Sequence, residues 1–93
     1  MITIHIPTPL RPFVDQQDTV NVNTKDTIGD VLSDLVTTYP DLQKHLYNAQ
    51  DEIRKFVNIY LNDEDIRYLN GAQTPLPETA TISIVPSIAG GHY

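Results

Sequence analysis

Apolar and polar residues alternate near the start of the chain, which is the pattern of half-buried β-strands. Residues 2–6 place three isoleucines on one face, and residues 19–23 alternate again after a polar turn at 15–18. Three prolines interrupt the first pattern, and Phe13 with Val14 could begin a strand after them. This part of the chain therefore predicts an N-terminal hairpin.

The clearest helical period begins directly after Thr27. Thr27 can cap the free N–H groups of a helix, and Asp30 occupies the third helical position, as in a capping box. Pro40 is expected to end the helix, because the residue before a proline disfavours helical geometry. The apolar face of this helix consists of Ile28, Val31, Leu32, Leu35, Val36 and Tyr39.

Strand-like alternation returns in the second half of the chain. Residues 56–61 alternate so that Phe56 and Tyr60 lie on the face opposite the apolar one. The two aromatic residues are either ordinary exposed side chains or part of a patch that docks a partner. The other expected elements are a helical turn near residues 42–47, a polar turn at 62–65, a short strand at 66–68, a turn at 70–71 and a last strand at 81–85.

One helix with one apolar stripe and one sheet with one apolar face can bury these surfaces only against each other. The order strand, strand, helix, strand, short strand, strand predicts an α+β, β-grasp (ubiquitin-like) fold, in which a mixed sheet packs on one main helix. We expect residues 1–86 to form this domain. Residues 87–93 are expected to form a flexible tail, and Pro86 to lie outside regular structure with it, because proline and paired glycines suit neither helix nor strand.

Composition excludes several kinds of site. The 93 residues include no cysteine, so a thiol nucleophile and a zinc–thiolate centre are excluded. His5, His45 and His92 have no shared ligand spacing, so no metal is expected. No acid–base or nucleophile constellation is visible, and we expect no enzymatic activity of its own.

Charge and hydropathy narrow the choice of partners. The formal net charge is −6, from 12 acidic and 6 basic residues, and the basic residues are scattered along the sequence. We therefore expect no nucleic-acid binding. The acidic surface either suits a partner with a basic docking face or only aids solubility. No apolar run is long enough to span a membrane and no signal segment is visible, so a cytoplasmic protein is expected.

The end of the chain carries the most specific motif. An apolar strand is followed by Pro86, Ile88, Ala89 and the pair Gly90 and Gly91. With this tail, and with similar segments at residues 6–12 and 54–67, the chain resembles the ubiquitin-like sulfur carriers, which include the molybdopterin synthase small subunit and the thiamine-pathway carrier. The likeness is strongest to the carrier used in cysteine synthesis and extends over most of the chain.

The resemblance implies that Gly91 is the reacting residue. In this family an adenylating enzyme uses ATP to activate the terminal glycine, and sulfide then converts it to a thiocarboxylate. ATP and sulfide would act through partner enzymes, and no cofactor would be bound by this chain. Two glycines make the tail narrow, Pro86 limits its freedom, and Ile88 would anchor it in the partner. The implied acceptor is a sulfhydrylase dependent on pyridoxal phosphate, or another sulfur acceptor enzyme.

The sequence departs from the simplest family pattern at its end, because His92 and Tyr93 follow Gly91. We expect a zinc metalloprotease of the JAMM type to remove them, the alternative being a tail that is never processed. Other functions also stay open. The chain could supply sulfur for molybdopterin or thiamine, modify lysines of target proteins through Gly91, or be an interaction domain that does not use its tail.

Overall fold

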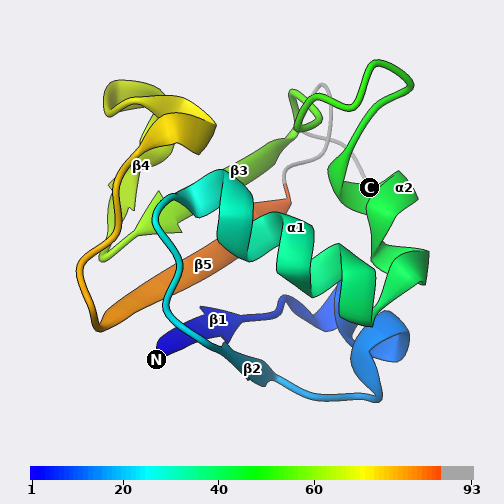
Figure 1. Cartoon of the computed structure of the whole chain (residues 1–93). Helices are drawn as coiled ribbons and strands as arrows, with labels where there is room; N and C mark the ends of the chain where they lie inside the picture. The colour runs from blue at the N-terminus through cyan, green and yellow to red at the C-terminus, as the bar shows by residue number, and fades with distance from the viewer. Residues whose placement is uncertain (87–93) are drawn as a thin grey trace.

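A five-stranded sheet in the order β2-β1-β5-β3-β4 carries one long helix across one face, as the computed structural model shows for residues 1–86 (Figure 1). Central β1 and β5 are parallel, and the other neighbouring strands are antiparallel. This confirms the predicted β-grasp fold. The strands are β1 (Ile2–His5), β2 (Thr19–Val22), β3 (Val57–Leu61), β4 (Glu64–Asp65) and β5 (Ala80–Pro86), and the α-helices are α1 (Ile28–Thr38) and α2 (Gln43–Leu46).

The core lies between the sheet and α1. Ile2 and Ile4 of β1 and Ile82 of β5 have no exposed surface, and they belong to the same buried cluster as the apolar residues of α1. Alternate residues of each strand point to this core, which is why strands with a period of two pack against a helix with a single apolar stripe.

Helix α1 has the boundaries that its sequence predicts. The Thr27 hydroxyl accepts a hydrogen bond from the Asp30 backbone N–H at 3.3 Å, which satisfies one of the free donors at the helix start. At the other end the Tyr39 N–H donates to the Leu35 carbonyl at 2.9 Å, immediately before Pro40. The predicted apolar face is buried or half-buried along its whole length.

The segment between β1 and β2 differs from the prediction. Phe13 and Val14 do not begin a strand, because they end a 3₁₀-helix, η1 (Thr8–Val14). Prolines within this segment cannot donate to a strand ladder, whereas their fixed φ suits a tight helix. The predicted polar turn follows it, with Asp15 and Gln16 at φ of 57° and 63°. β1 and β2 then pair as the expected antiparallel hairpin.

The segment after β3 also needs correction. The turn consists only of Asn62 and Asp63, both with positive φ, and β4 follows it and pairs back onto β3. The predicted strand at residues 66–68 is a 3₁₀-helix, η3 (Ile66–Tyr68), whose first turn is capped by Asp65 accepting from the Arg67 N–H at 2.8 Å. Burial of Ile66 alone does not require a strand, since the start of a short helix buries it equally well.

The remaining connections are short. η2 (Pro40–Leu42) and α2 bury Leu42 and Leu46 against the core, which confirms the predicted helical turn there. The turn expected at residues 70–71 is followed by η4 (Gly71–Gln73), with Gly71 at φ 58°. Within residues 1–86, no helix is long and apolar enough to cross a membrane.

Candidate functional site at the root of the C-terminal tail

The predicted tail leaves the fold from the end of a central strand. Pro86 is the last residue of β5 and lies opposite Val57 of β3. The expectation that Pro86 lies outside regular structure is therefore wrong, because a proline at the final position of a strand removes only one N–H from the ladder. The other predicted site residues lie outside the described residues: Ile88, Ala89, Gly90, Gly91, His92 and Tyr93.

On the β1 side, the end of β5 borders an apolar groove. The pairing of β1 with β5 ends at His5 and Ser83, so β5 continues beyond its neighbour. There the chain turns away, because the Ile6 N–H bonds to the Asp18 carbonyl at 2.8 Å and Arg11 donates to the Ile6 carbonyl at 3.1 Å. The resulting groove of about 440 Å³ is lined by His5, Ile6, Pro7, Pro9, Ser83, Ile84, Val85 and Pro86.

On the β3 side, a second groove of about 340 Å³ reaches Pro86. It is lined by Asn48, Arg54, Lys55, Phe56, Val57 and Pro86. The Phe56 side chain is 51% exposed here, directly before β3 begins. Tyr60 is half-buried further along β3, opposite Ser83 and Asp65. Of the two aromatic residues that the sequence leaves as either ordinary exposed side chains or part of a docking patch, Phe56 is the one in the groove that contains Pro86.

Arg67 holds the start of β3 in place. Its Nη2 atom donates to the Lys55 carbonyl at 2.7 Å and to the Val57 carbonyl at 3.1 Å, and its Nη1 atom donates to the Asn58 side chain. The first turn of η3 positions this guanidinium through its Asp65 cap. Arg67 thus fixes the strand that borders Pro86, a role that its sequence position did not indicate.

Four basic residues gather around this end of the sheet, and we call Lys44, Arg54, Lys55 and Arg67 the basic cluster. Arg54 Nε donates to the Lys44 carbonyl at 2.8 Å, as Arg67 does to the Lys55 carbonyl. The side-chain hydrogen bonds of Arg54 and Arg67 thus go to neutral oxygen atoms, which do not neutralise the positive charge of either guanidinium group. These residues are scattered along the sequence; the one signal that they could cluster is that four of the six basic residues fall between positions 44 and 67.

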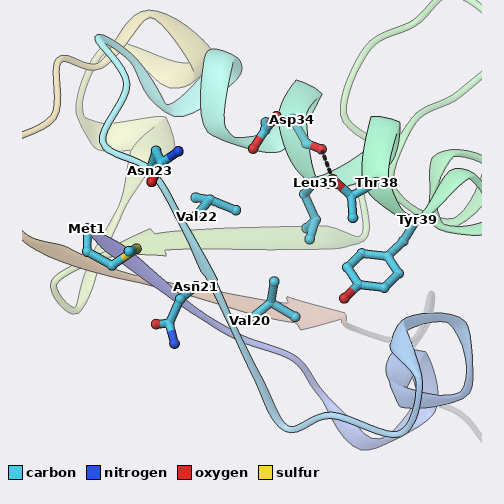
Figure 2. Close-up of a pocket in the computed structure, with 9 residues that line it drawn as sticks. All are labelled: Met1, Val20, Asn21, Val22, Asn23, Asp34, Leu35, Thr38 and Tyr39. Atoms are coloured by element: carbon cyan, nitrogen blue, oxygen red, sulfur yellow. Dashed lines mark hydrogen bonds between the residues drawn. The ribbon is translucent and has the colours of Figure 1, made fainter.

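A further groove lies at the opposite edge of the sheet, between β2 and α1 (Figure 2). Val20 and Val22 of the edge strand and Leu35 of the helix form its floor, and Met1, Asp34 and Tyr39 lie around them. β1 separates this edge from β5, so the groove is not part of the tail root.

Two ionisable side chains, Tyr47 and His45, are notable for their burial or their lack of a partner. Burial, and secondarily the charge of Asp51, raises the pKa of the Tyr47 hydroxyl above its ordinary value of 10.0, so it stays neutral at physiological pH. The His45 ring stacks on Phe13, with ring centroids 4.3 Å apart, and its buried Nε2 atom has no hydrogen-bond partner among residues 1–86. Within the same residues, no group of three His, Asp or Glu side chains could hold a metal ion.

Comparison with known proteins decides the family. The model of the ThiS family matches residues 4–91, which include the strand-ending Pro86 and both tail glycines. The chain belongs to the ThiS family. This agrees with the ubiquitin-like resemblance of its sequence and with its β-grasp fold.

Several relatives of this ThiS family member are full-length matches. The chain is 38% identical over 92 residues to a protein of Mycobacterium tuberculosis named "Sulfur carrier protein CysO", covering 97% of this chain and 98% of the relative. The crystal structure of that M. tuberculosis CysO superposes with a TM-score of 0.85 at 36% identity, covering 95% of this chain and all of the other.

Two other similar proteins are a chain from a protein complex and a protein named as a modifier. The structure of an Amycolatopsis orientalis BexX/CysO complex contains a chain that matches with a TM-score of 0.87 at 27% identity, covering 98% of this chain and 100% of the other. A protein of Haloferax volcanii named "Small archaeal modifier protein 3" is 34% identical over 65 residues, which cover 70% of each chain.

Proposed function

We propose that this protein is a sulfur carrier whose Gly91 is activated as an adenylate and converted to a thiocarboxylate that donates sulfur, for cysteine biosynthesis. The observation that carries the proposal is the 38% identity to the M. tuberculosis sulfur carrier protein CysO over nearly the whole of both chains. Membership of the ThiS family, with a match that extends through Gly91, supports it. In this role the protein is a cosubstrate and not an enzyme.

The proposed chemistry needs little from the fold beyond an accessible terminus. The Gly91 carboxylate attacks the α-phosphate of ATP on the adenylating enzyme, and pyrophosphate leaves. Sulfide then attacks the acyl carbon, a C–S bond forms, the C–O bond to AMP breaks, and no oxidation or reduction is required. A carboxylate alone is a poor electrophile, and AMP supplies the leaving group. ATP and sulfide are thus consumed through partner enzymes, and the carrier itself binds no cofactor.

The proposed acceptor is a sulfhydrylase that uses pyridoxal phosphate, and this cofactor belongs to the partner. Transfer would leave cysteine joined to Gly91, and a JAMM-type zinc metalloprotease would release it. The same class of protease would first remove His92 and Tyr93, because Gly91 has a free carboxylate to activate only when it is the last residue. Intact mass spectrometry of protein from its native host tests this step. A mature protein that always keeps both residues would contradict it.

The activation step has a direct test. A chain ending at Gly91 is incubated with the adenylating enzyme of the same host, ATP and sulfide, and its intact mass is measured. We expect the mass increase of one oxygen replaced by sulfur, whereas a chain ending at Gly90 and the full chain ending at Tyr93 should give none. If the Gly91 chain forms neither adenylate nor thiocarboxylate, the proposed function is wrong.

A second function is a modifier joined to lysines of target proteins. The similarity to small archaeal modifier protein 3 of H. volcanii favours it specifically. Both functions require an adenylate at Gly91, so the outcome after activation distinguishes them. Sulfide incorporation supports the carrier, and isopeptide-linked adducts found by mass spectrometry in host lysate support the modifier. Sulfur transfer for molybdopterin or thiamine would instead be revealed by the acceptor that consumes the thiocarboxylate.

A further inference from the structure

The surface around Pro86 differs in charge from the rest of the protein. The whole chain carries 12 acidic and 6 basic residues, yet the groove beside Pro86 is lined by Arg54 and Lys55 and by no carboxylate. A neighbouring groove, which shares Lys55 and Val57 with it, is lined by Lys55 and Arg67 and again by no carboxylate. The tail root is therefore a local basic surface on an acidic molecule.

The basic cluster forms a continuous surface. Arg54 and Asn48 line both the groove at Pro86 and a neighbouring groove that contains Lys44. Lys55 and Val57 connect the groove at Pro86 to the one that contains Arg67. Acidic groups also approach the cluster: Asp41 lines the groove of Lys44, Asp51 lies near Tyr47, and the Asp65 carboxylate accepts from the Arg67 backbone N–H.

The length of the tail requires a partner to come close to this surface. Gly91 is the fifth residue after Pro86, and five fully extended residues span at most about 18 Å. An enzyme that encloses the Gly91 carboxylate must therefore place its active site within this distance of Pro86. Because an enzyme is much larger than that distance, its surface must cover part of the fold around the tail root.

We infer that the basic cluster docks acidic side chains of the adenylating enzyme while the tail enters its active site. This inference rests on the proposed function and names the partner surface for it. The overall acidity of the chain suits either a partner with a basic docking face or solubility alone, but the charge at the tail root has the opposite sign. Because the groove that contains Pro86, Arg54 and Lys55 has no carboxylate in its lining, an acidic partner surface would orient the carrier with its tail foremost. The exposed Phe56 lies within this contact as an apolar neighbour of Pro86.

Charge reversal of single lysines tests the inference. Arg67 bonds to the backbone carbonyl of Lys55, and Arg54 bonds to the backbone carbonyl of Lys44. Because Lys55→Glu and Lys44→Glu replace only the side chains, both hydrogen bonds can remain. Lys25→Glu is the matched control, because it makes the same change of charge between β2 and α1. Each variant ends at Gly91, and its folding is verified by circular dichroism before adenylation is measured.

Steady-state adenylation by the host's adenylating enzyme is the readout, with the carrier as varied substrate. We expect the KM of Lys55→Glu to rise at least about fivefold with kcat little changed, and Lys44→Glu to have a smaller effect in the same direction. Lys25→Glu should leave KM within about twofold of the unmodified chain. Raising the salt concentration should increase the KM of the unmodified chain more than that of Lys55→Glu.

The outcomes separate this inference from the proposed function. If the unmodified chain is adenylated and Lys55→Glu has the same KM as Lys25→Glu, the docking inference is wrong and the carrier function stands. A lower KM for Lys55→Glu would mean that the partner surface is basic, and this also overturns the inference. If the unmodified chain is not adenylated, the proposed function fails and the inference fails with it.

Discussion

Val57 and Pro86 face each other as the last residue pair of the β3–β5 ladder. This pair joins the tail root to the start of β3, where Lys55 and Phe56 stand directly before Val57. The position of Pro86, from which the tail continues, therefore depends on the strand that follows Lys55. Changes to either residue of the pair should affect how the tail is presented.

Pro86→Ala tests how much the tail root benefits from a fixed φ. Alanine can occupy the end of β5, so we expect the free energy of unfolding to change by less than about 1 kcal/mol. The KM for adenylation should rise about twofold to fivefold, because a more flexible tail loses more entropy on docking. Pro77→Ala, on the connection before β5, is the control and should leave KM unchanged. Equal KM values for the two variants would contradict the prediction.

Arg67 is predicted to stabilise the fold through its hydrogen bonds to the carbonyls of Lys55 and Val57. Arg67→Ala should lower the free energy of unfolding by about 1–2 kcal/mol, a modest amount because the side chain is largely exposed. Arg67→Lys should recover less than half of this loss, since one ammonium group cannot reproduce the planar fork of a guanidinium. Urea denaturation measures both, and Lys25→Ala, with an expected effect below about 0.5 kcal/mol, is the control.

His45 contains a buried nitrogen that residues 1–86 leave without a partner. His45→Phe removes this atom and keeps an aromatic ring against Phe13, so it should raise the free energy of unfolding by about 1 kcal/mol. His45→Ala should instead destabilise the protein, because the stacking and the buried area are lost. Thermal denaturation distinguishes the variants. A destabilised His45→Phe protein would show that Nε2 has a partner in solution.

The buried hydroxyl of Tyr47 should make the free energy of unfolding fall as the pH rises into the alkaline range. Burial and Asp51 raise the pKa of its hydroxyl above 10.0, so the folded state holds this proton more tightly than the unfolded chain. The corresponding stability is fully present below about pH 10 and is lost as the pH rises through the raised pKa. Tyr47→Phe should reduce this loss in urea denaturation series between about pH 9 and pH 11.

Tyr68→Phe is the control for that series, because the Tyr68 side chain is 88% exposed. It should keep the alkaline loss of stability that the unmodified protein shows. A Tyr47→Phe protein that loses stability as steeply as Tyr68→Phe would mean that the Tyr47 hydroxyl is not held in its neutral form by the fold.

The sequence alone determined the elements whose signals are local. Helix α1 is specified by the Thr27 cap, an apolar stripe and Pro40, all within about four turns of chain. The alternation in β1, β2, β3 and β5 predicted which faces are buried, and the order of the elements then left the β-grasp fold as the arrangement that buries both apolar surfaces. The glycine pair of the tail was also visible without a structure, because it is a contiguous motif.

Local apolar patterns did not predict the type of element where a strand and a short helix can bury the same residues. Val14 is buried from a 3₁₀-helix as fully as it could be from a strand, and Ile66 likewise, so apolar character could not distinguish the two. Pro86 was assigned to the tail because proline is rare in strands, but its place at the end of the ladder depends on Val57, a residue distant in sequence.

Only the tertiary structure decided what surrounds the tail root. Lys44, Arg54 and Lys55 precede β3 and Arg67 follows β4, and the sequence contains no spacing rule that brings them to Pro86. Arg54 and Lys55 come to Pro86 because β3 pairs with β5. Arg67 joins them because it bonds back across the turn to the carbonyls of Lys55 and Val57, and Lys44 because its carbonyl accepts from Arg54. Side-chain charge is a property of each residue, whereas a charged surface depends on long-range strand pairing, which is fixed only when the chain folds.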